Sequence, residues 1–173
     1  MKVIIIHRRS CVYYKVSSDS FIKEFTPKFS SKLKYFFKLR KYPGKNFYYI
    51  SNLLNSLNIK TAKIISYSNY HIETKNIDGI TLEEFIKIKG DNYDYIISQY
   101  IFLILTLIKN NIYCGDLHFG NFIVKNNELY ALDLEDYHHK NIFWSYKKCF
   151  LSRLKGKIPK EIFEDIIKQL ETT

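Results

Sequence analysis

Two short strands joined by a tight connection constrain the second half of this chain more than any other feature. Residues 122–125 and 128–132 both have strand character, and only Asn126-Asn127 separates them. Asparagine tolerates positive φ angles, so this dipeptide favours a two-residue hairpin turn. A hairpin folds the chain back on itself, and it therefore places Asp133 beside Asn121, the residue that precedes the first strand.

A third polar residue belongs to the same pattern. Asp116 lies five positions before Asn121, which is the catalytic-loop spacing of kinase-like phosphotransferases. In that chemistry one aspartate accepts the proton of the attacking hydroxyl, while an asparagine and a second aspartate hold Mg²⁺ against the nucleotide phosphates. Asp116 is therefore the candidate general base. Asn121 and Asp133 are the candidate metal ligands, because their oxygen donors suit a hard cation.

The rest of the chain mixes strands with amphipathic helices. We expect strands at about 3–6, 11–16, 21–25, 62–67 and 70–75, and helices at about 30–40, 46–57, 81–89, 93–110, 141–153 and 159–170. Tyr42-Pro43-Gly44 is expected to end the first helix, and Thr81 with Glu84 forms a candidate capping box. This order predicts an α+β chain of one domain with two lobes, 1–76 and 77–173.

Nucleotide binding is expected at two places in the first lobe. Lys23 lies in the third expected strand, where a lysine neutralises the phosphates of ATP in kinase-like enzymes. The segment that contains Lys75 and Ile77 follows the last strand of this lobe, where a hinge belongs. A hinge backbone typically hydrogen-bonds the adenine edge, so Lys75 and Ile77 are candidate ATP-binding residues.

These features resemble the lipopolysaccharide core heptose kinase family of the protein-kinase-like superfamily. The resemblance rests on four segments in family order, at 21–28, 77–82, 115–125 and 132–134. It implies a compact protein-kinase-like fold, with a small antiparallel-sheet N-terminal lobe and a mostly helical, shortened C-terminal lobe. It also implies phosphorylation of an inner-core heptose at the cytoplasmic face of the inner membrane, with ATP and Mg²⁺ or Mn²⁺ as cofactors.

Among several departures from the general kinase pattern, two bear most directly on activity. Residues 25–72 contain no Asp or Glu, so the helix expected at 46–57 lacks the glutamate that usually pairs with the strand lysine. The first glycine of the chain is Gly44, so no glycine-rich phosphate loop precedes the strand lysine. Both departures favour reduced activity or a pseudokinase.

Other polar side chains near the candidate site are expected to have structural roles. Glu135 and Asp136 follow Asp133, and either is a candidate cation ligand, but solvent exposure of both is the favoured expectation. His118 is expected to hold its loop with a hydrogen bond, and Cys114 is expected to be a small buried side chain.

Charge suggests the kind of partner. Lys+Arg 27 against Asp+Glu 17 gives a formal net charge of +10, which favours an anionic partner. Aromatic residues interleave with the basic ones between residues 23 and 63, a pattern that single-stranded nucleic acid can use. A solvated helix face is the favoured interpretation of this pattern, so nucleic acid is not expected. The resemblance implies a glycolipid substrate, and the basic surface suits peripheral contact with an anionic inner membrane.

Location follows from apolar runs and cysteines. No window reaches the roughly 18 unbroken apolar residues of a membrane span, and the N-terminus lacks the features of a signal peptide. The 3 cysteines are widely spaced, which suits a reducing cytoplasm. A cytoplasmic protein is therefore expected.

Two alternatives to the heptose kinase stay open. One is a kinase that acts on a protein or on another small molecule. The other is a pseudokinase that binds a nucleotide without turnover. The set of Asp116, Asn121 and Asp133 favours an enzyme, whereas the missing helix glutamate and glycine loop favour the pseudokinase.

Overall fold

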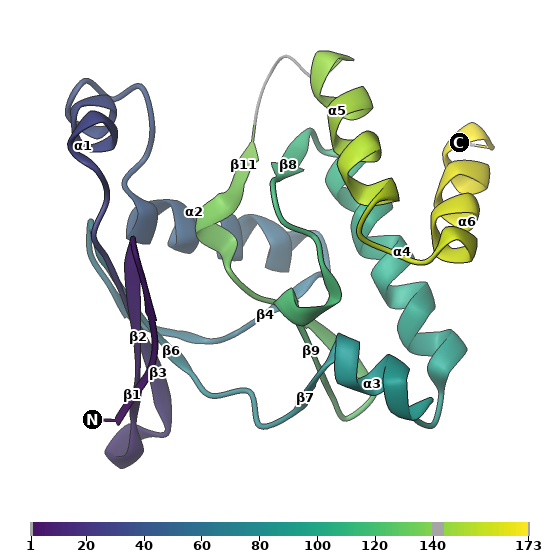
Figure 1. Ribbon diagram of the computed structural model, residues 1–173, viewed down its shortest axis with the longest axis horizontal. Helices are drawn as coiled ribbons and strands as arrows, with labels where there is room; N and C mark the ends of the chain where they lie inside the picture. Colours follow the sequence, from purple (N-terminus) through teal and green to yellow (C-terminus); the bar gives the residue numbers. More distant parts are fainter. Residues whose placement is uncertain (1, 140–143, 173) are drawn as a thin grey trace.

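The computed structural model describes residues 2–139 and 144–172. An antiparallel sheet forms the N-terminal region and helices gather in the C-terminal region, so the expected α+β class is confirmed (Figure 1). The sheet has five strands in the order β1-β2-β3-β6-β5. Their bounds are β1 Lys2–His7, β2 Ser10–Lys15, β3 Ser20–Phe25, β6 His71–Lys75 and β5 Ile64–Tyr67.

Strand β3 occupies the centre of this sheet and carries the candidate phosphate lysine. Lys23 lies opposite Val12 of β2 and opposite Ile72 of β6, so antiparallel neighbours fix its backbone on both sides. The expected N-terminal meander is thus confirmed. The turn between β1 and β2 consists of Arg8 and Arg9, without the glycines that a phosphate loop uses.

Two helices follow β3, and their boundary differs from the sequence prediction. Helix α1 covers Phe29–Phe36 and helix α2 covers Pro43–Ser56. Pro43 was expected to stop the first helix, but α1 already ends at Phe36. Pro43 instead opens α2, because a proline costs no hydrogen bond in the first turn of a helix. A Cβ on Gly44 would lie 2.2 Å from the carbonyl oxygen of Ser68, so only glycine lets α2 begin this close to the β5–β6 turn.

A second sheet joins distant parts of the chain in the order β4-β10-β9-β7. Its strands are β4 Lys60–Thr61, β10 Glu128–Ala131, β9 Phe122–Lys125 and β7 Ile80–Thr81. The predicted hairpin is confirmed: β9 and β10 pair antiparallel, and Asn126 and Asn127 have φ angles of 50° and 60°. The parallel pairing of β4 with β10 was not foreseen from the sequence.

The described residues form four further α-helices: α3 Leu82–Ile88, α4 Tyr93–Lys109, α5 Trp144–Lys155 and α6 Lys160–Glu171. The capping box of Thr81 and Glu84 opens α3 as expected. The first residues of the helix expected at 141–153 lie outside the described part of the chain. Within residues 2–139 and 144–172, none of the helices combines the length and apolar character needed to span a bilayer.

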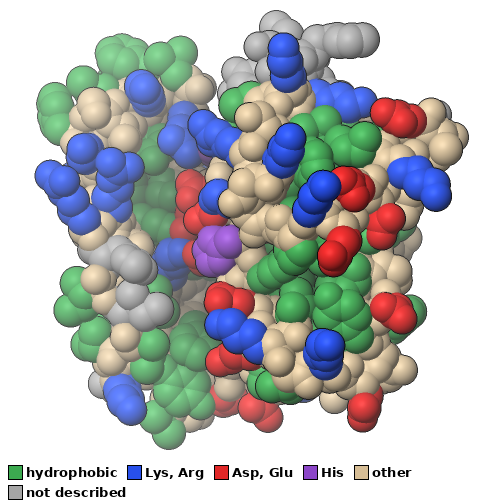
Figure 2. All heavy atoms as spheres, turned by 45° about the vertical axis from the view of Figure 1, so that its right-hand side comes forward, with side chains coloured by type: hydrophobic (Ala, Val, Ile, Leu, Met, Phe, Trp, Pro, Cys, Tyr) green, Lys and Arg blue, Asp and Glu red, His purple; other side chains and the backbone are tan. Residues whose placement is uncertain are grey.

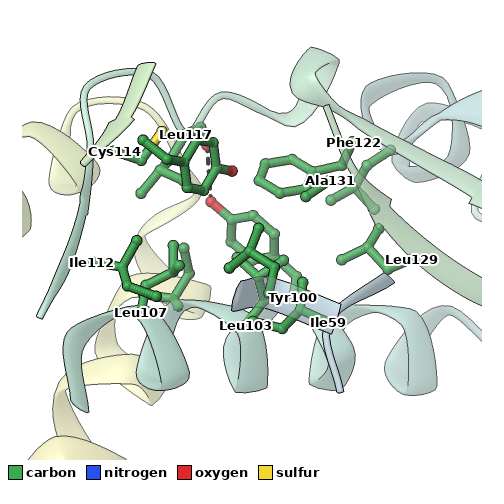
Figure 3. Packing of buried hydrophobic residues seen from close by; sticks show 14 of the residues in the cluster. Ile59, Tyr100, Leu103, Leu107, Ile112, Cys114, Leu117, Phe122, Leu129 and Ala131 are labelled. Atoms are coloured by element: carbon green, nitrogen blue, oxygen red, sulfur yellow. Dashed lines mark hydrogen bonds between the residues drawn. The ribbon is translucent and has the colours of Figure 1, made fainter. Parts of the chain in front are cut away.

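Helix α4 packs along one side of the hydrophobic core and supplies many of its residues. Tyr100, Leu103 and Leu107 project from it toward the β9–β10 hairpin and toward the segment 112–117 (Figure 3). Phe122 of the hairpin is fully buried, and its ring meets the Tyr100 ring edge-on with centroids 5.2 Å apart. The hairpin and the Asp116 loop therefore rest on one helix, which fixes their relative positions.

Candidate active site

The loop that carries Asp116 is held by strand pairing at its start and by a hydrogen bond from helix α4. It follows β8, Ile112–Cys114, which pairs antiparallel with β11, Tyr137–His139. The buried hydroxyl of Tyr100 donates to the carbonyl oxygen of Leu117 at 2.9 Å (Figure 3). A buried carbonyl without a partner is costly, so this bond ties the loop to α4.

The hairpin brings the three sequence-predicted polar residues together. The side-chain amide nitrogen of Asn121 donates to the carbonyl oxygen of Asp116 at 3.0 Å. The backbone N–H of Leu132 donates to the carbonyl oxygen of Asn121 at 2.9 Å, which places Asp133 next to Asn121. Asp133 has a φ of 51°, a left-handed conformation that is uncommon outside glycine.

Lys23 reaches this cluster across the fold. Its ammonium group lies 2.8 Å from Asp133 Oδ1 and 2.5 Å from Glu135 Oε1. The side chains of Lys23 and Glu135 are only 15% and 14% exposed, whereas that of Asp133 is 50% exposed. The expectation that Glu135 faces solvent is therefore wrong, because the 3₁₀ turn at Leu134–Asp136 turns its carboxylate inward. Asp136 is at the surface as expected.

Burial controls the titration of this pair. Loss of hydration raises the pKa of Glu135 to about 7, although the nearby ammonium of Lys23 acts in the opposite direction. Burial by itself lowers the pKa of Lys23, but the attraction of Glu135 and Asp133 outweighs it and raises that pKa overall. Oxygen Oε2 of Glu135 is buried and has no hydrogen-bond partner within the described residues.

Helix α2 holds the segment that carries these carboxylates. The side-chain amide of the buried Asn46 donates to the carbonyl oxygen of Glu135 at 3.1 Å and to that of Tyr137 at 2.8 Å. As the sequence indicated, the helix supplies no acidic partner for Lys23. It supplies an amide that fixes the backbone around Glu135, the acidic partner that Lys23 does have.

Asp116 has a different cation. Lys157, in the turn between α5 and α6, forms an ion pair with Asp116 Oδ1. The ring of His118 is near the other carboxylate oxygen, with Nε2 3.6 Å from Asp116 Oδ2. Its Nδ1 accepts a hydrogen bond from the backbone N–H of Gly120 at 3.0 Å. The second contact matches the structural role expected for His118. Sequence reasoning missed Lys157, because no motif connects it to the loop.

The two candidate hinge residues lie away from these contacts. The ammonium group of Lys75 donates to the carbonyl oxygen of Ser18 at 2.9 Å, and its backbone N–H donates to the carbonyl oxygen of Lys63 at 2.8 Å. The carbonyl oxygen of Ile77 accepts the N–H of Gly79 at 2.8 Å. Residues 76–79 connect the five-stranded sheet to β7, so the segment does join the two sheets, but its contact with adenine stays a prediction.

The donor atoms near Asp133 fit a hard divalent cation. Asn121 uses its amide nitrogen internally, so its oxygen is left to bind a metal, and Asp133 contributes a half-exposed carboxylate. The unpartnered Oε2 of Glu135 adds an oxygen on the same turn. Mg²⁺ completes such sparse sets with water and phosphate oxygens. No group of three or more His, Cys, Asp or Glu side chains suited to a metal occurs in residues 2–139 and 144–172.

Solved structures share this architecture. Rio2 kinase of Chaetomium thermophilum, solved as an ADP/Mg²⁺-phosphoaspartate complex, is similar at a TM-score of 0.59 and 13% identity, over 97% of this chain and 61% of that one. WbdD in complex with the kinase inhibitor LY294002 gives a TM-score of 0.58 at 11% identity, over 94% of this chain and 44% of that one. No protein-family model and no curated protein matches the sequence.

The likeness establishes a protein-kinase-like fold for this chain and, at these identities, only the fold. The chain spans less than two thirds of the length of either structure.

Proposed function

We propose that the chain is an ATP-dependent phosphotransferase that transfers a phosphoryl group to a hydroxyl, with an inner-core heptose of lipopolysaccharide as the acceptor. One observation carries the proposal. Lys23 and Asp133 are 110 positions apart in sequence, yet their charged groups lie 2.8 Å apart, beside Asn121 and in a protein-kinase-like fold. A phosphate lysine and a metal carboxylate must be neighbours for this chemistry.

In the proposed reaction Asp116 acts on the acceptor hydroxyl, while Lys23, Asn121 and Asp133 act on the phosphates of ATP. Asp116 accepts the proton of the acceptor hydroxyl, whose oxygen forms a bond to the γ-phosphorus. The bond from that phosphorus to the β–γ bridging oxygen breaks, and ADP leaves with the electron pair. Lys23 offsets phosphate charge, and a magnesium ion bound by Asn121 and Asp133 would supply further neutralisation.

Glu135 supplies the acidic partner for Lys23 whose absence from the helix favoured a pseudokinase. The missing helix glutamate matters only if nothing else orients the strand lysine, and Glu135 contacts that lysine at 2.5 Å from a largely buried position. Asn46 fixes the backbone on which Glu135 sits. We assign Glu135 the role of positioning Lys23, so that the phosphate lysine is held without an acidic residue in α2.

The choice of acceptor rests on charge and on the family resemblance. A formal net charge of +10 suits an acceptor that bears phosphate groups at an anionic membrane face. Peripheral contact with that membrane belongs to the same proposal, and a nucleic-acid partner does not.

The deciding experiment uses γ-labelled ATP with Mg²⁺ or Mn²⁺ and lipopolysaccharide from a strain that lacks its core kinase. Wild type should label the glycolipid, and Asp116→Ala should not. Asp91→Asn, an exposed aspartate in the turn before α4, is the matched control and should keep wild-type activity. Label in Asp116→Ala at the wild-type rate would refute the assignment of the base.

Other outcomes select between the alternatives. Nucleotide binding without transfer to any hydroxyl would indicate a pseudokinase, which the glycine-free β1–β2 turn favours. Failure to bind nucleotide at all would exclude both the phosphotransferase and the pseudokinase. A pelleting assay with anionic vesicles at low salt tests the membrane contact separately.

A further inference from the structure

A pocket of about 510 Å³ lies beside the Asp116 loop and apart from the nucleotide residues. Helix α3 forms one wall, His118 and Phe119 form a second, and the turn between α5 and α6 forms a third. Lys23, Asn121 and Asp133 are absent from its lining. The pocket is therefore separate from the atoms proposed to hold the phosphates of ATP.

The pocket borders the side chains that contact Asp116, although Asp116 itself is not one of its lining residues. Two of its lining residues, Lys157 and His118, are the side chains that contact the two oxygens of that carboxylate. A molecule in the pocket would thus contact the two side chains that flank the proposed base. Figure 2 shows acidic and basic side chains gathered around the hollow between the two halves of this face of the molecule, whereas the pocket is bounded by α3, residues 118–119 and the α5–α6 turn.

The pairing of Lys157 with Asp116 poses a chemical problem for any acceptor. A hydroxyl must reach the Asp116 carboxylate to give up its proton, but an ammonium group occupies Oδ1 and opposes proton transfer to it. Both side chains are partly exposed, at 36% for Lys157 and 45% for Asp116. Ion pairs this exposed are weak, so the ammonium can exchange partners at small cost.

We propose that this pocket binds the acceptor, and that the acceptor carries a phosphate or other oxyanion next to its reacting hydroxyl. On binding, the oxyanion takes the ammonium of Lys157 while the hydroxyl takes its place on Asp116. The apolar side chains of Ile86, Phe119 and Ile158 would then contact the carbon face of the acceptor. The inference rests on the proposed function for the role of Asp116, and it adds the location and the charge of the substrate.

The test measures binding without turnover. The probe is the deacylated, phosphorylated core oligosaccharide, compared with the same oligosaccharide after removal of its phosphates. Calorimetry on the full chain should show that Lys157→Met weakens binding of the phosphorylated probe about 10-fold or more, while Lys157→Arg recovers part of it. Binding of the dephosphorylated probe should be weak and the same in wild type and Lys157→Met.

Lys160→Met is the matched control, because Lys160 lies three positions further along but outside this pocket. It should bind both probes as wild type does. Equal losses for both probes in Lys157→Met would overturn the proposal, since Lys157 would then only shape the pocket. So would unchanged binding of the phosphorylated probe, or no binding of it to wild type.

The label-transfer assay separates this inference from the proposed function. Binding that depends on Lys157, without phosphoryl transfer, would retain the pocket and reject the phosphotransferase. Phosphoryl transfer together with binding that does not depend on Lys157 would retain the phosphotransferase and reject the assignment of the pocket.

Discussion

The two lysine–carboxylate clusters of the candidate active site differ in burial. Lys23 lies between Asp133 and Glu135 with 15% of its side chain exposed, whereas Lys157 lies on Asp116 with 36% exposed. A buried ion pair is expensive to break because the charge left behind cannot return to water, and an exposed pair is cheap to exchange. We infer that the Lys23–Glu135 pair is built to stay assembled, whereas the Lys157–Asp116 pair can open for an acceptor.

The largest expected effect follows from removing the buried cation. Lys23→Met leaves Asp133 and the buried Glu135 without a partner, and it should lower the free energy of unfolding by about 3–5 kcal/mol. Lys157→Met should lower it by less than about 1 kcal/mol. Urea denaturation of both variants at pH 8 measures the difference. Similar losses in the two variants would contradict the contrast between the clusters.

The buried carboxylate should also make stability depend on pH. The folded-state pKa of Glu135, about 7, lies above its unfolded value, so the folded state binds the extra proton and stability falls as pH rises between the two values. Wild type should therefore lose about 3 kcal/mol relative to Glu135→Gln between pH 4.5 and pH 8, in a buffer with chelator. A constant difference between the two proteins across this range would contradict the burial of Glu135.

A smaller effect tests how the exposed cluster is supported. Tyr100→Phe removes the donor to the carbonyl of Leu117 and should cost about 1–3 kcal/mol, with slower phosphoryl transfer because the Asp116 loop loses its tie to α4. Tyr95→Phe, at an exposed position of the same helix, is the control and should change stability by less than about 0.5 kcal/mol. Thermal unfolding and the label-transfer rate measure the two consequences.

The smallest effect concerns the pocket wall beside Asp116. Thr81→Ala removes the capping box of α3 and should cost about 1 kcal/mol. Because α3 lines the pocket, affinity for the phosphorylated oligosaccharide should fall more than affinity for nucleotide. Thr172→Ala, at the exposed end of α6, should leave both affinities unchanged and serves as the control. Equal losses of affinity for the two ligands in Thr81→Ala would contradict a role of α3 in acceptor binding.

Local sequence signals predicted the elements with simple periodicity or turn chemistry. The asparagine pair defined the hairpin, Thr81 and Glu84 defined the start of α3, and the apolar pattern of 93–110 defined α4. Pro43 was misassigned as the terminator of the first helix, because proline after one helix and proline at the start of the next give the same local signal.

By itself, the sequence determined that Asp116, Asn121 and Asp133 would share one loop and hairpin, because short-range turn geometry decides that. The tertiary structure alone decided which cation faces which carboxylate. Lys23 meets Glu135 across 112 positions, and Lys157 meets Asp116 across 41. Neither pair leaves a periodic or spaced pattern in the chain, since each depends on how the central sheet, α4 and the α5–α6 turn pack around one core.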